Sequence, residues 1–304
     1  MLPPGWDALA RETFASPVFK AILYGRDDFA LESIDYFVGF RPEPGFLKSL
    51  PNLKAVISLG AGVDGFLKDP DFPKHLPLVR CVDPNLAREM SEYVVMHALI
   101  LHRHQRFFDT AQGEHKWRQK MMTRGPGDTR IGMLGLGTMG GLIAARLQVF
   151  EFQLLGWSRS RRNLPGIKSF AGFEELPAFL SQCDMLVCAL PLTPDTRGIL
   201  NAEHFAQMPK GAAVINVARG QHLIEEDLIA ALDSGYLSAA VLDVFQTEPL
   251  PEDSPIWRHP KITATPHIAG ITAPSAALAH VEDTIHRVEN GEPLINVVDL
   301  SRGY

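Results

Sequence analysis

Three features are scarce in this chain of 304 residues: cysteine, long apolar runs and an excess of basic charge. Three cysteines cannot all pair, and Cys183 and Cys188 flank an apolar run, so we expect buried free thiols. No stretch approaches the about 18 apolar residues of a membrane-spanning helix, and the first residues lack the apolar run of a signal peptide. A net charge of −6 disfavours nucleic acid as a partner. The sequence therefore predicts a cytoplasmic protein that binds neither nucleic acid nor membrane.

A strand, a glycine-rich turn and a helix follow one another directly in residues 130–149, RIGMLGLGTMGGLIAARLQV. The turn is a G-x-G-x-x-G formed by Gly135, Gly137 and Gly140. In this motif the first glycine permits a tight turn, the second admits a pyrophosphate, and the third lets the helix pack on the strand. The start of the helix then offers N–H groups to the phosphates. Glycine-rich turns also occur for structural reasons alone, but this context favours a dinucleotide site.

The motif begins only after about 130 residues, which indicates a separate domain before it. After it, predicted strands and helices alternate, as in a doubly wound parallel sheet. Strands are expected at 18–25, 35–40, 55–59, 78–82, 130–134, 152–157, 185–190, 213–217, 239–244 and 262–264, and helices at 174–181, 225–234 and 272–289. We therefore predict a Rossmann domain at 98–272, inserted in a smaller, discontinuous substrate domain at 1–97 and 273–304, with a cleft between them.

Residues 85–111 are expected to form one long helix with apolar side chains on more than one face. Such a helix is buried between domains or against another subunit, so we predict a homodimer built on it. His97, His102 and His104 lie within the helix, but no cysteine or carboxylate set accompanies them at the spacing of a metal site. We therefore predict no metal.

A second glycine-rich turn, Gly60-Ala61-Gly62-Val63, follows the strand expected at 55–59 and lacks the dinucleotide spacing. Such a turn can point several backbone N–H groups at one small anion. It can equally serve only to reverse the chain. The first interpretation makes Gly60, Ala61 and Gly62 contacts for a substrate carboxylate.

Polar side chains follow three successive predicted strands: Arg219, Glu248 and His267. The carboxyl ends of parallel strands share one edge of the sheet, where ligands bind. His267 can give a proton to a carbonyl oxygen near neutral pH, and Glu248 would orient its ring and favour the charged form. Arg219 offers a planar fork to a carboxylate or carbonyl oxygen. The set predicts hydride transfer from a nicotinamide cofactor to a small 2-oxo acid that contacts Arg219 and His267.

The runs INVARGQHLIEEDL (215–228), AVLDVFQTEPLPEDSPIW (240–257) and TPHIAG (265–270) resemble signature blocks of the D-isomer-specific 2-hydroxyacid dehydrogenase family. SLGAGVD (58–64), CALPLTPDT (188–196), the long helix and the closing RGY (302–304) are similar to its glyoxylate/hydroxypyruvate reductase A group. The resemblance spans nearly the whole chain. It implies a flavodoxin-like substrate domain around a Rossmann domain, catalysis by Arg219, Glu248 and His267, Asp243 near the nicotinamide amide, and a two-fold dimer through the long helix.

Trp117 lies in the loop after that helix. In the family, a tryptophan from this loop can reach the site of the partner subunit. Plain core packing is the alternative for Trp117, and the sequence does not decide between them.

The second strand of the Rossmann domain ends in Ser158-Arg159-Ser160-Arg161-Arg162, without the acid that binds the ribose of NAD. A small hydroxyl at Ser158 admits a 2′-phosphate and Arg159 can bind it, so we predict NADPH, with NADH weaker. The remaining basic residues suit a solvated turn. The expected cofactor contacts are Gly135, Gly137, Thr138, Met139, Gly140, Ser158, Arg159, Leu190, Pro191, Thr196, Val217, Ala218, Asp243 and Gly270.

Two alternatives remain open, and a third is disfavoured. The substrate could be a bulkier 2-oxo acid, because the sequence does not reveal what contacts the end away from the carboxylate. GLGTMG alone also resembles the 3-hydroxyisobutyrate dehydrogenase group, but there the motif opens the chain and a lysine serves the chemistry. A non-catalytic nucleotide-sensing protein of the same fold would share the catalytic positions, and only turnover of a 2-oxo acid separates it from an enzyme.

Overall fold

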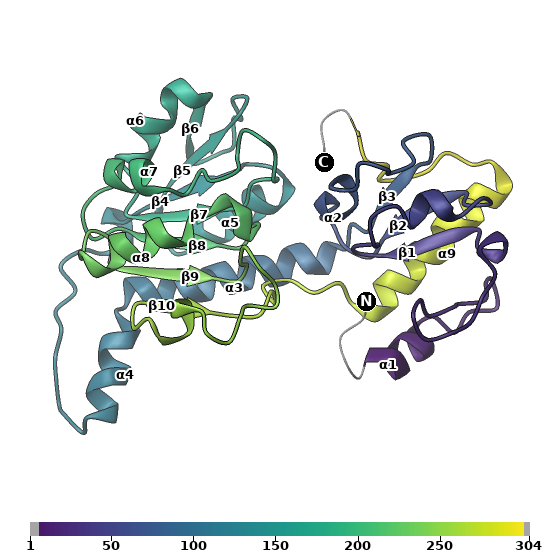
Figure 1. Cartoon of the computed structure of the whole chain (residues 1–304). Coiled ribbons are helices and arrows are strands. Elements are labelled where there is room, and N and C mark those ends of the chain that lie inside the picture. The colour runs from purple at the N-terminus through teal and green to yellow at the C-terminus, as the bar shows by residue number, and fades with distance from the viewer. Residues whose placement is uncertain (1–5, 301–304) are drawn as a thin grey trace. The chain divides into compact units, whose positions relative to one another are not determined.

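The computed structural model describes residues 6–300 and divides the chain into two compact units (Figure 1). The first unit comprises residues 1–86 and 272–304, and the second comprises residues 87–271. The division falls inside α3 (Pro84–His102), earlier than the domain boundary predicted after residue 97. The closing RGY lies outside the described residues. Within the described part of the chain, no helix is long and apolar enough to cross a membrane.

The second unit contains a seven-stranded parallel sheet in the order β10-β9-β8-β7-β4-β5-β6. The chain starts in the middle at β4, moves outward to β6, and then returns to the other side of β4. This arrangement is the Rossmann type, with its switch point between β4 and β7. The bounds are β4 Arg130–Leu134, β5 Gln153–Ser158, β6 Ile167–Ala171, β7 Met185–Cys188, β8 Ala213–Asn216, β9 Ala239–Leu242 and β10 Ile262–Ala264.

Helices cover both faces of this sheet, because its strands are apolar on both sides. One face packs on the carboxyl part of α3 and on α5 (Thr138–Gln148), through Val94, Ala98, Ile143 and Leu147. The other face packs on three helices, α6 (Leu176–Leu180), α7 (Ala202–Gln207) and α8 (Glu225–Asp233). The predicted α/β Rossmann architecture is confirmed.

The first unit contains a three-stranded parallel sheet, β1 (Tyr36–Gly39), β2 (Ala55–Ser58) and β3 (Leu78–Arg80). Apolar side chains pack on both of its faces. One cluster includes Leu47, Phe66 and Val298, and the other joins the sheet to α9 (Pro274–Asn290) through Val281. The described helices α1 (Trp6–Thr13) and α2 (Asp64–Leu67) complete this unit.

Two predictions of secondary structure are wrong. Residues 18–25 form coil and turn, because only Phe19 of that run packs in an apolar cluster and no neighbouring strand pairs with it. The long helix is two helices, α3 and α4 (Gln105–Gly113), because His104 adopts the left-handed conformation with φ of 55°. The edge strand β6 was not predicted. The three cysteines are buried free thiols, as expected.

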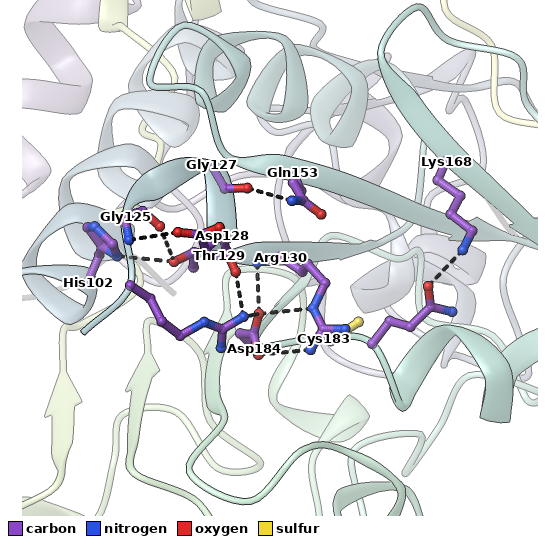
Figure 2. Close-up of polar contacts among 12 residues, drawn as sticks. His102, Gly125, Gly127, Asp128, Thr129, Arg130, Gln153, Lys168, Cys183 and Asp184 are labelled. Carbon is purple, nitrogen blue, oxygen red and sulfur yellow. Dashed lines mark hydrogen bonds and ion pairs between the residues drawn. The ribbon is translucent and has the colours of Figure 1, made fainter. Parts of the chain in front are cut away.

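Asp184 joins the amino ends of β4 and β7 (Figure 2). Arg124 donates to both carboxylate oxygens, at 2.9 and 3.0 Å, and the side chain and backbone N–H of Arg130 donate as well. The Asp184 side chain is only 13% exposed. Burial alone would raise the pKa of its carboxyl, but the two guanidinium groups and the backbone N–H lower it overall. This ion-pair cluster fixes the edge of the sheet opposite the predicted site.

Candidate active site

The glycine-rich turn has the geometry that a pyrophosphate requires. Gly135 has φ of +101°, and a Cβ there would lie 2.8 Å from the Ala189 carbonyl oxygen. A Cβ on Gly140 would lie 1.9 Å from the Gly135 carbonyl oxygen, so the helix packs directly on the turn. Gly137, in contrast, has no atom within 4 Å of its Cβ position and immediately precedes α5. The residues present therefore fit a dinucleotide, whose phosphates can approach Gly137 and the start of the helix.

The predicted contacts after β7 lie next to this turn, because β7 pairs with β4, and those after β8 lie one strand further along the sheet. Leu190, Val217 and Ala218 are buried, and their contact with the cofactor stays a prediction. Thr196 uses its hydroxyl within the protein and donates to the Pro191 carbonyl oxygen at 2.8 Å. Its role in the structure is to hold the turn that follows β7.

The end of β5 contains no carboxylate. Ser158 donates to the Ser160 carbonyl oxygen at 2.8 Å, and the Arg159 side chain is exposed. Arg161 is held by Glu175 and by the Ser169 carbonyl oxygen. Arg161 is therefore a structural residue, as the solvated-turn interpretation expects, whereas Ser158 and Arg159 end the strand that borders the glycine turn.

Arg219 follows β8 in a turn that two further polar residues shape. Asn216 donates to the Arg219 carbonyl oxygen at 3.0 Å and accepts from the Ala218 N–H at 3.1 Å. Fully buried His222 contacts the Arg219 backbone and the Pro191 carbonyl oxygen at 3.2 Å. Sequence reasoning missed Asn216 and His222, although both lie within the quoted run 215–228.

Gly220 fixes the distance between the Arg219 turn and the strand end of β9. A Cβ on Gly220 would lie 1.8 Å from the carbonyl carbon of Phe245, so only glycine fits there. The segment that leads to Glu248 starts at this contact. The structure thus holds two of the three predicted strand ends against each other.

His267 and Glu248 form a hydrogen-bonded pair. His267 Nδ1 lies 2.9 Å from Glu248 Oε2, while Glu248 Oε1 accepts from the Phe245 N–H at 3.0 Å. The His267 side chain is 46% exposed, and no other residue among 6–300 is a hydrogen-bond partner of its Nε2. Burial would raise the pKa of the Glu248 carboxyl, but His267, the Phe245 N–H and the charge of Arg219 lower it overall. The carboxylate is therefore ionised at neutral pH and orients the ring.

Backbone hydrogen bonds to Asp243 hold the loop that contains His267. His267 has φ of 56°, a conformation that L residues rarely adopt. Its N–H donates to the carbonyl oxygens of Asp243 and Thr265, at 2.9 and 3.0 Å. The Asp243 carboxylate is 1% exposed and accepts from the N–H groups of Ile268 and Ala269. The hydrogen bonds of the Asp243 carboxylate are all to groups of the protein itself. That Asp243 lies near the nicotinamide therefore stays a prediction.

Several predicted contacts lie elsewhere in the chain. Gly60, Ala61 and Gly62 belong to the first unit, where Ser58 Oγ donates to the Gly60 carbonyl oxygen at 3.0 Å and shapes the turn. Trp117 is 94% exposed, so it is not a core residue of the described chain. Within residues 6–300 no group of three His, Cys, Asp or Glu side chains is arranged to hold a metal ion.

The order of the strands, the glycine turn and the switch point define a Rossmann dinucleotide-binding unit. Residues 95–269 match the family model described as D-isomer specific 2-hydroxyacid dehydrogenase, NAD binding domain. The chain belongs to the D-isomer-specific 2-hydroxyacid dehydrogenase family, as predicted from its sequence. It is therefore an NAD(P)-dependent oxidoreductase that acts on CH–OH groups.

Solved structures of three relatives resemble most of the chain. A D-isomer specific 2-hydroxyacid dehydrogenase from Xanthobacter autotrophicus Py2, in complex with NADPH and MES, is 42% identical, with 91% of this chain and 87% of that chain covered and a TM-score of 0.84. An NADPH-dependent glyoxylate/hydroxypyruvate reductase from Sinorhizobium meliloti, in complex with NADP and sulfate, is 41% identical (coverage 90% and 87%, TM-score 0.84). A probable 2-hydroxyacid dehydrogenase from Rhizobium etli CFN 42, in complex with NADP, is 38% identical (coverage 92% and 88%, TM-score 0.82).

Proposed function

We propose that this protein reduces a small 2-oxo acid, glyoxylate or hydroxypyruvate, to the 2-hydroxy acid with NADPH, and that Arg219, Glu248 and His267 carry the reaction. The observation that carries the proposal is the His267–Glu248 pair at 2.9 Å, on the edge of the sheet where a Rossmann unit binds its ligands. The similarity to the Sinorhizobium meliloti glyoxylate/hydroxypyruvate reductase supports this choice of substrate.

The His267–Glu248 pair indicates which nitrogen of His267 gives the proton to the substrate. Glu248 accepts from Nδ1, and the other nitrogen of this half-exposed ring has no partner among residues 6–300, so it can donate to the carbonyl oxygen of the substrate. The ionised carboxylate stabilises the imidazolium that must exist before the transfer. In the reverse reaction, the oxidation of a 2-hydroxy acid, the neutral ring of His267 would accept the proton of the hydroxyl group. A nicotinamide cofactor held by the glycine turn would supply the hydride that the carbonyl carbon takes up.

Arg219 is proposed to bind the substrate carboxylate and the adjacent carbonyl oxygen. Its Nη1 donates to the Ala218 carbonyl oxygen at 2.6 Å, which anchors the guanidinium within its own turn. The charge of Arg219 also reaches Glu248, whose pKa it helps to lower. A planar guanidinium binds a carboxylate through two parallel hydrogen bonds, which suits a 2-oxo acid. Contacts from Gly60, Ala61 and Gly62 remain part of this proposal.

We propose NADPH as the preferred cofactor because the end of β5 offers Ser158 and Arg159 and no carboxylate. A carboxylate at this position would repel a 2′-phosphate, whereas a hydroxyl and a guanidinium can bind it. Three relatives whose structures contain NADPH or NADP support the preference. The other cofactor contacts are proposed at the residues given above for the glycine turn, β7, β8, Asp243 and Gly270.

A steady-state assay tests the proposal. NADPH and NADH are each combined with glyoxylate, hydroxypyruvate, pyruvate and phenylpyruvate, and kcat/KM is measured for every pair. We expect the highest value for NADPH with glyoxylate or hydroxypyruvate. A higher value with phenylpyruvate would point to the bulkier substrate. NADPH binding without turnover of any acid would favour a nucleotide-sensing protein and contradict the proposal.

We further propose a homodimer built on residues 85–111. Much of the apolar surface of α3 packs within the second unit, but Met96 is 48% exposed. Val149 and Phe150, which are 78% and 39% exposed, line the same groove as Met96. Burial of this apolar patch against a second copy would remove it from water. Sedimentation that shows only monomer at micromolar concentration would contradict the dimer.

A further inference from the structure

The His267 loop is attached to α3 at both of its ends. At the start of the loop, the Tyr93 hydroxyl lies 2.6 Å from Thr265 Oγ1. At the end of the loop, the Ile271 N–H donates to Glu89 Oε2 at 3.0 Å. Glu89 and Tyr93 are four positions apart and so lie on one face of the helix, one turn from each other. The family blocks quoted above do not include either residue of α3.

In the hydrogen bond between Tyr93 and Thr265, the donor can be assigned. Thr265 donates its hydroxyl proton to Asp243 Oδ1 at 2.6 Å, and a hydroxyl group has only one proton to donate. Thr265 Oγ1 therefore accepts from Tyr93. Burial raises the pKa of the Tyr93 hydroxyl to about 12, so it retains its proton and stays a donor. The result is a chain of two short hydrogen bonds, each of 2.6 Å, that runs from Tyr93 through Thr265 to Asp243.

Asp243 connects these hydrogen bonds to the loop that contains His267. Its oxygens accept from the N–H groups of Ile268 and Ala269 at 2.9 and 2.8 Å, directly after His267. These bonds hold the backbone in which His267 keeps its positive φ. Without the Thr265 hydroxyl, Asp243 Oδ1 would lose one of its donors in a buried position, and the carboxylate would be free to turn away from the loop.

The Tyr93 ring is itself fixed in place. It packs on the His97 ring at a centroid distance of 4.3 Å, one turn further along α3. His97 is buried, and burial lowers the pKa of its ring, so the neighbour of Tyr93 is an uncharged ring. The tyrosine hydroxyl therefore points at Thr265 from a rigid support.

We propose that Tyr93 and Thr265 are positioning residues that act through Asp243 to hold the His267 ring where it can transfer its proton. The inference rests on the proposed role of His267. Neither side chain is required to touch the substrate, and the chain of hydrogen bonds supplies the constraint that the strained loop needs. A small displacement of a catalytic group lowers the rate strongly, since proton transfer depends on hydrogen-bond distance.

Four variants test the proposal. Thr265→Val should lower kcat about 10-fold, and Tyr93→Phe about 3-fold, because the first breaks both hydrogen bonds and the second only one. Thr265→Ser keeps the hydroxyl and should restore kcat to within about 2-fold. The double variant Tyr93→Phe/Thr265→Val should be no slower than Thr265→Val alone, since both act along one path. The affinity for NADPH, measured by fluorescence titration, should stay within about 2-fold.

A second readout does not depend on activity. Hydrogen exchange of the peptide that contains Ile268 and Ala269 should be faster in Thr265→Val and Tyr93→Phe than in the wild type. Tyr236→Phe is the matched control, because the Tyr236 hydroxyl donates to the carbonyl oxygens of Ala206 and Met208, in a different part of the same unit. It should change neither the exchange of this peptide nor kcat.

The outcomes separate the two proposals. Wild-type exchange of this peptide in Thr265→Val and Tyr93→Phe, or kcat no lower than in Tyr236→Phe, would overturn the positioning role. Additive losses of kcat in the double variant would also contradict it, because they indicate two independent effects. If the wild type reduces no 2-oxo acid, the proposed function fails, and the exchange measurement still decides whether Tyr93 and Thr265 hold the loop. If Thr265→Val does not fold, Tyr93→Phe gives the same decision.

Discussion

The strands of the seven-stranded sheet have amino ends on one side, here called the amino edge, and carboxyl ends on the other, the carboxyl edge. Each edge holds a carboxylate among basic side chains, and the two edges differ in whether a polar atom is left without a hydrogen-bond partner. At the amino edge, where Figure 2 labels Asp184 and Arg130, both oxygens of Asp184 accept from Arg124 and Arg130. The Asp184 side chain is 13% exposed. At the carboxyl edge, Glu248 holds one nitrogen of a half-exposed His267, and the other nitrogen has no partner among residues 6–300. The first cluster is saturated and stabilises the fold. The second is held on one side only, as a group that transfers protons must be.

The largest expected effect is at His267. His267→Gln should lower kcat about 10²- to 10⁴-fold, because it removes the general acid, while NADPH binding stays near normal. His259→Gln is the matched control, since His259 Nε2 also contacts a carboxylate, Asp233, at 3.2 Å. Steady-state kinetics of both variants check the prediction. Equal kcat in the two variants would remove His267 from the mechanism.

The second prediction concerns Ser158 and Arg159 and the preference for NADPH that we propose for them. Ser158→Asp with Arg159→Ala should reverse a preference for NADPH over NADH that we expect to be about 10- to 150-fold, the value of one hydrogen bond to a charged group. Arg161→Ala removes the same charge but takes it from a residue paired with Glu175, so the preference should not change. The ratio of kcat/KM for the two cofactors is the measurement. A wild type that uses both equally well would contradict the interpretation of Ser158 and Arg159.

Arg219→Lys should raise the KM for the 2-oxo acid and lower kcat, each about 10-fold, because an ammonium cannot form two parallel hydrogen bonds. Arg130→Lys makes the same change at the amino edge, where Nε and Nη2 both donate to Asp184. It should reduce stability and leave both kinetic constants near normal. If Arg219→Lys changed only the affinity for NADPH, Arg219 would serve the cofactor instead.

The smallest expected effect concerns stability and pH. Burial lowers the pKa of His97, and both of its ring nitrogens lack a hydrogen-bond partner in the described chain. As the pH falls below about 6.5, the unfolded state takes up a proton before the folded state does, so stability decreases. His97→Phe should remove up to about 1 kcal/mol of this loss between pH 6.5 and 5.5. Urea unfolding measures it, with His286→Phe, on an exposed ring, as the control. An unchanged slope would mean that His97 does not titrate on unfolding.

The sequence allowed most strands of the second unit to be predicted, because strands buried on both faces are continuous apolar runs. It did not reveal β6, an edge strand with Lys168 and Ser169 in its middle, nor the break at His104, which depends on one backbone angle. Arg219, Glu248 and His267 could be proposed because parallel strands bring their ends to one edge. Their supports were invisible, since the bond between Tyr93 and Thr265 joins residues 172 positions apart.

The comparison of the two edges is tested most directly by measuring both unfolding free energy and kcat for Asp184→Asn and Glu248→Gln. Both carboxyl groups have a lowered pKa, so each stabilises the fold above its ordinary pKa and loses this effect as the pH falls through its lowered value. At pH 7, Asp184→Asn should cost about 2 kcal/mol of stability with kcat near normal, because it removes the charge that pairs with two partly exposed guanidinium groups. Glu248→Gln should cost about 1 kcal/mol or less, while kcat falls about 10- to 150-fold. If Asp184→Asn lowered kcat as much as Glu248→Gln did, or if Glu248→Gln lost only stability, the division between a structural and a catalytic edge would be contradicted.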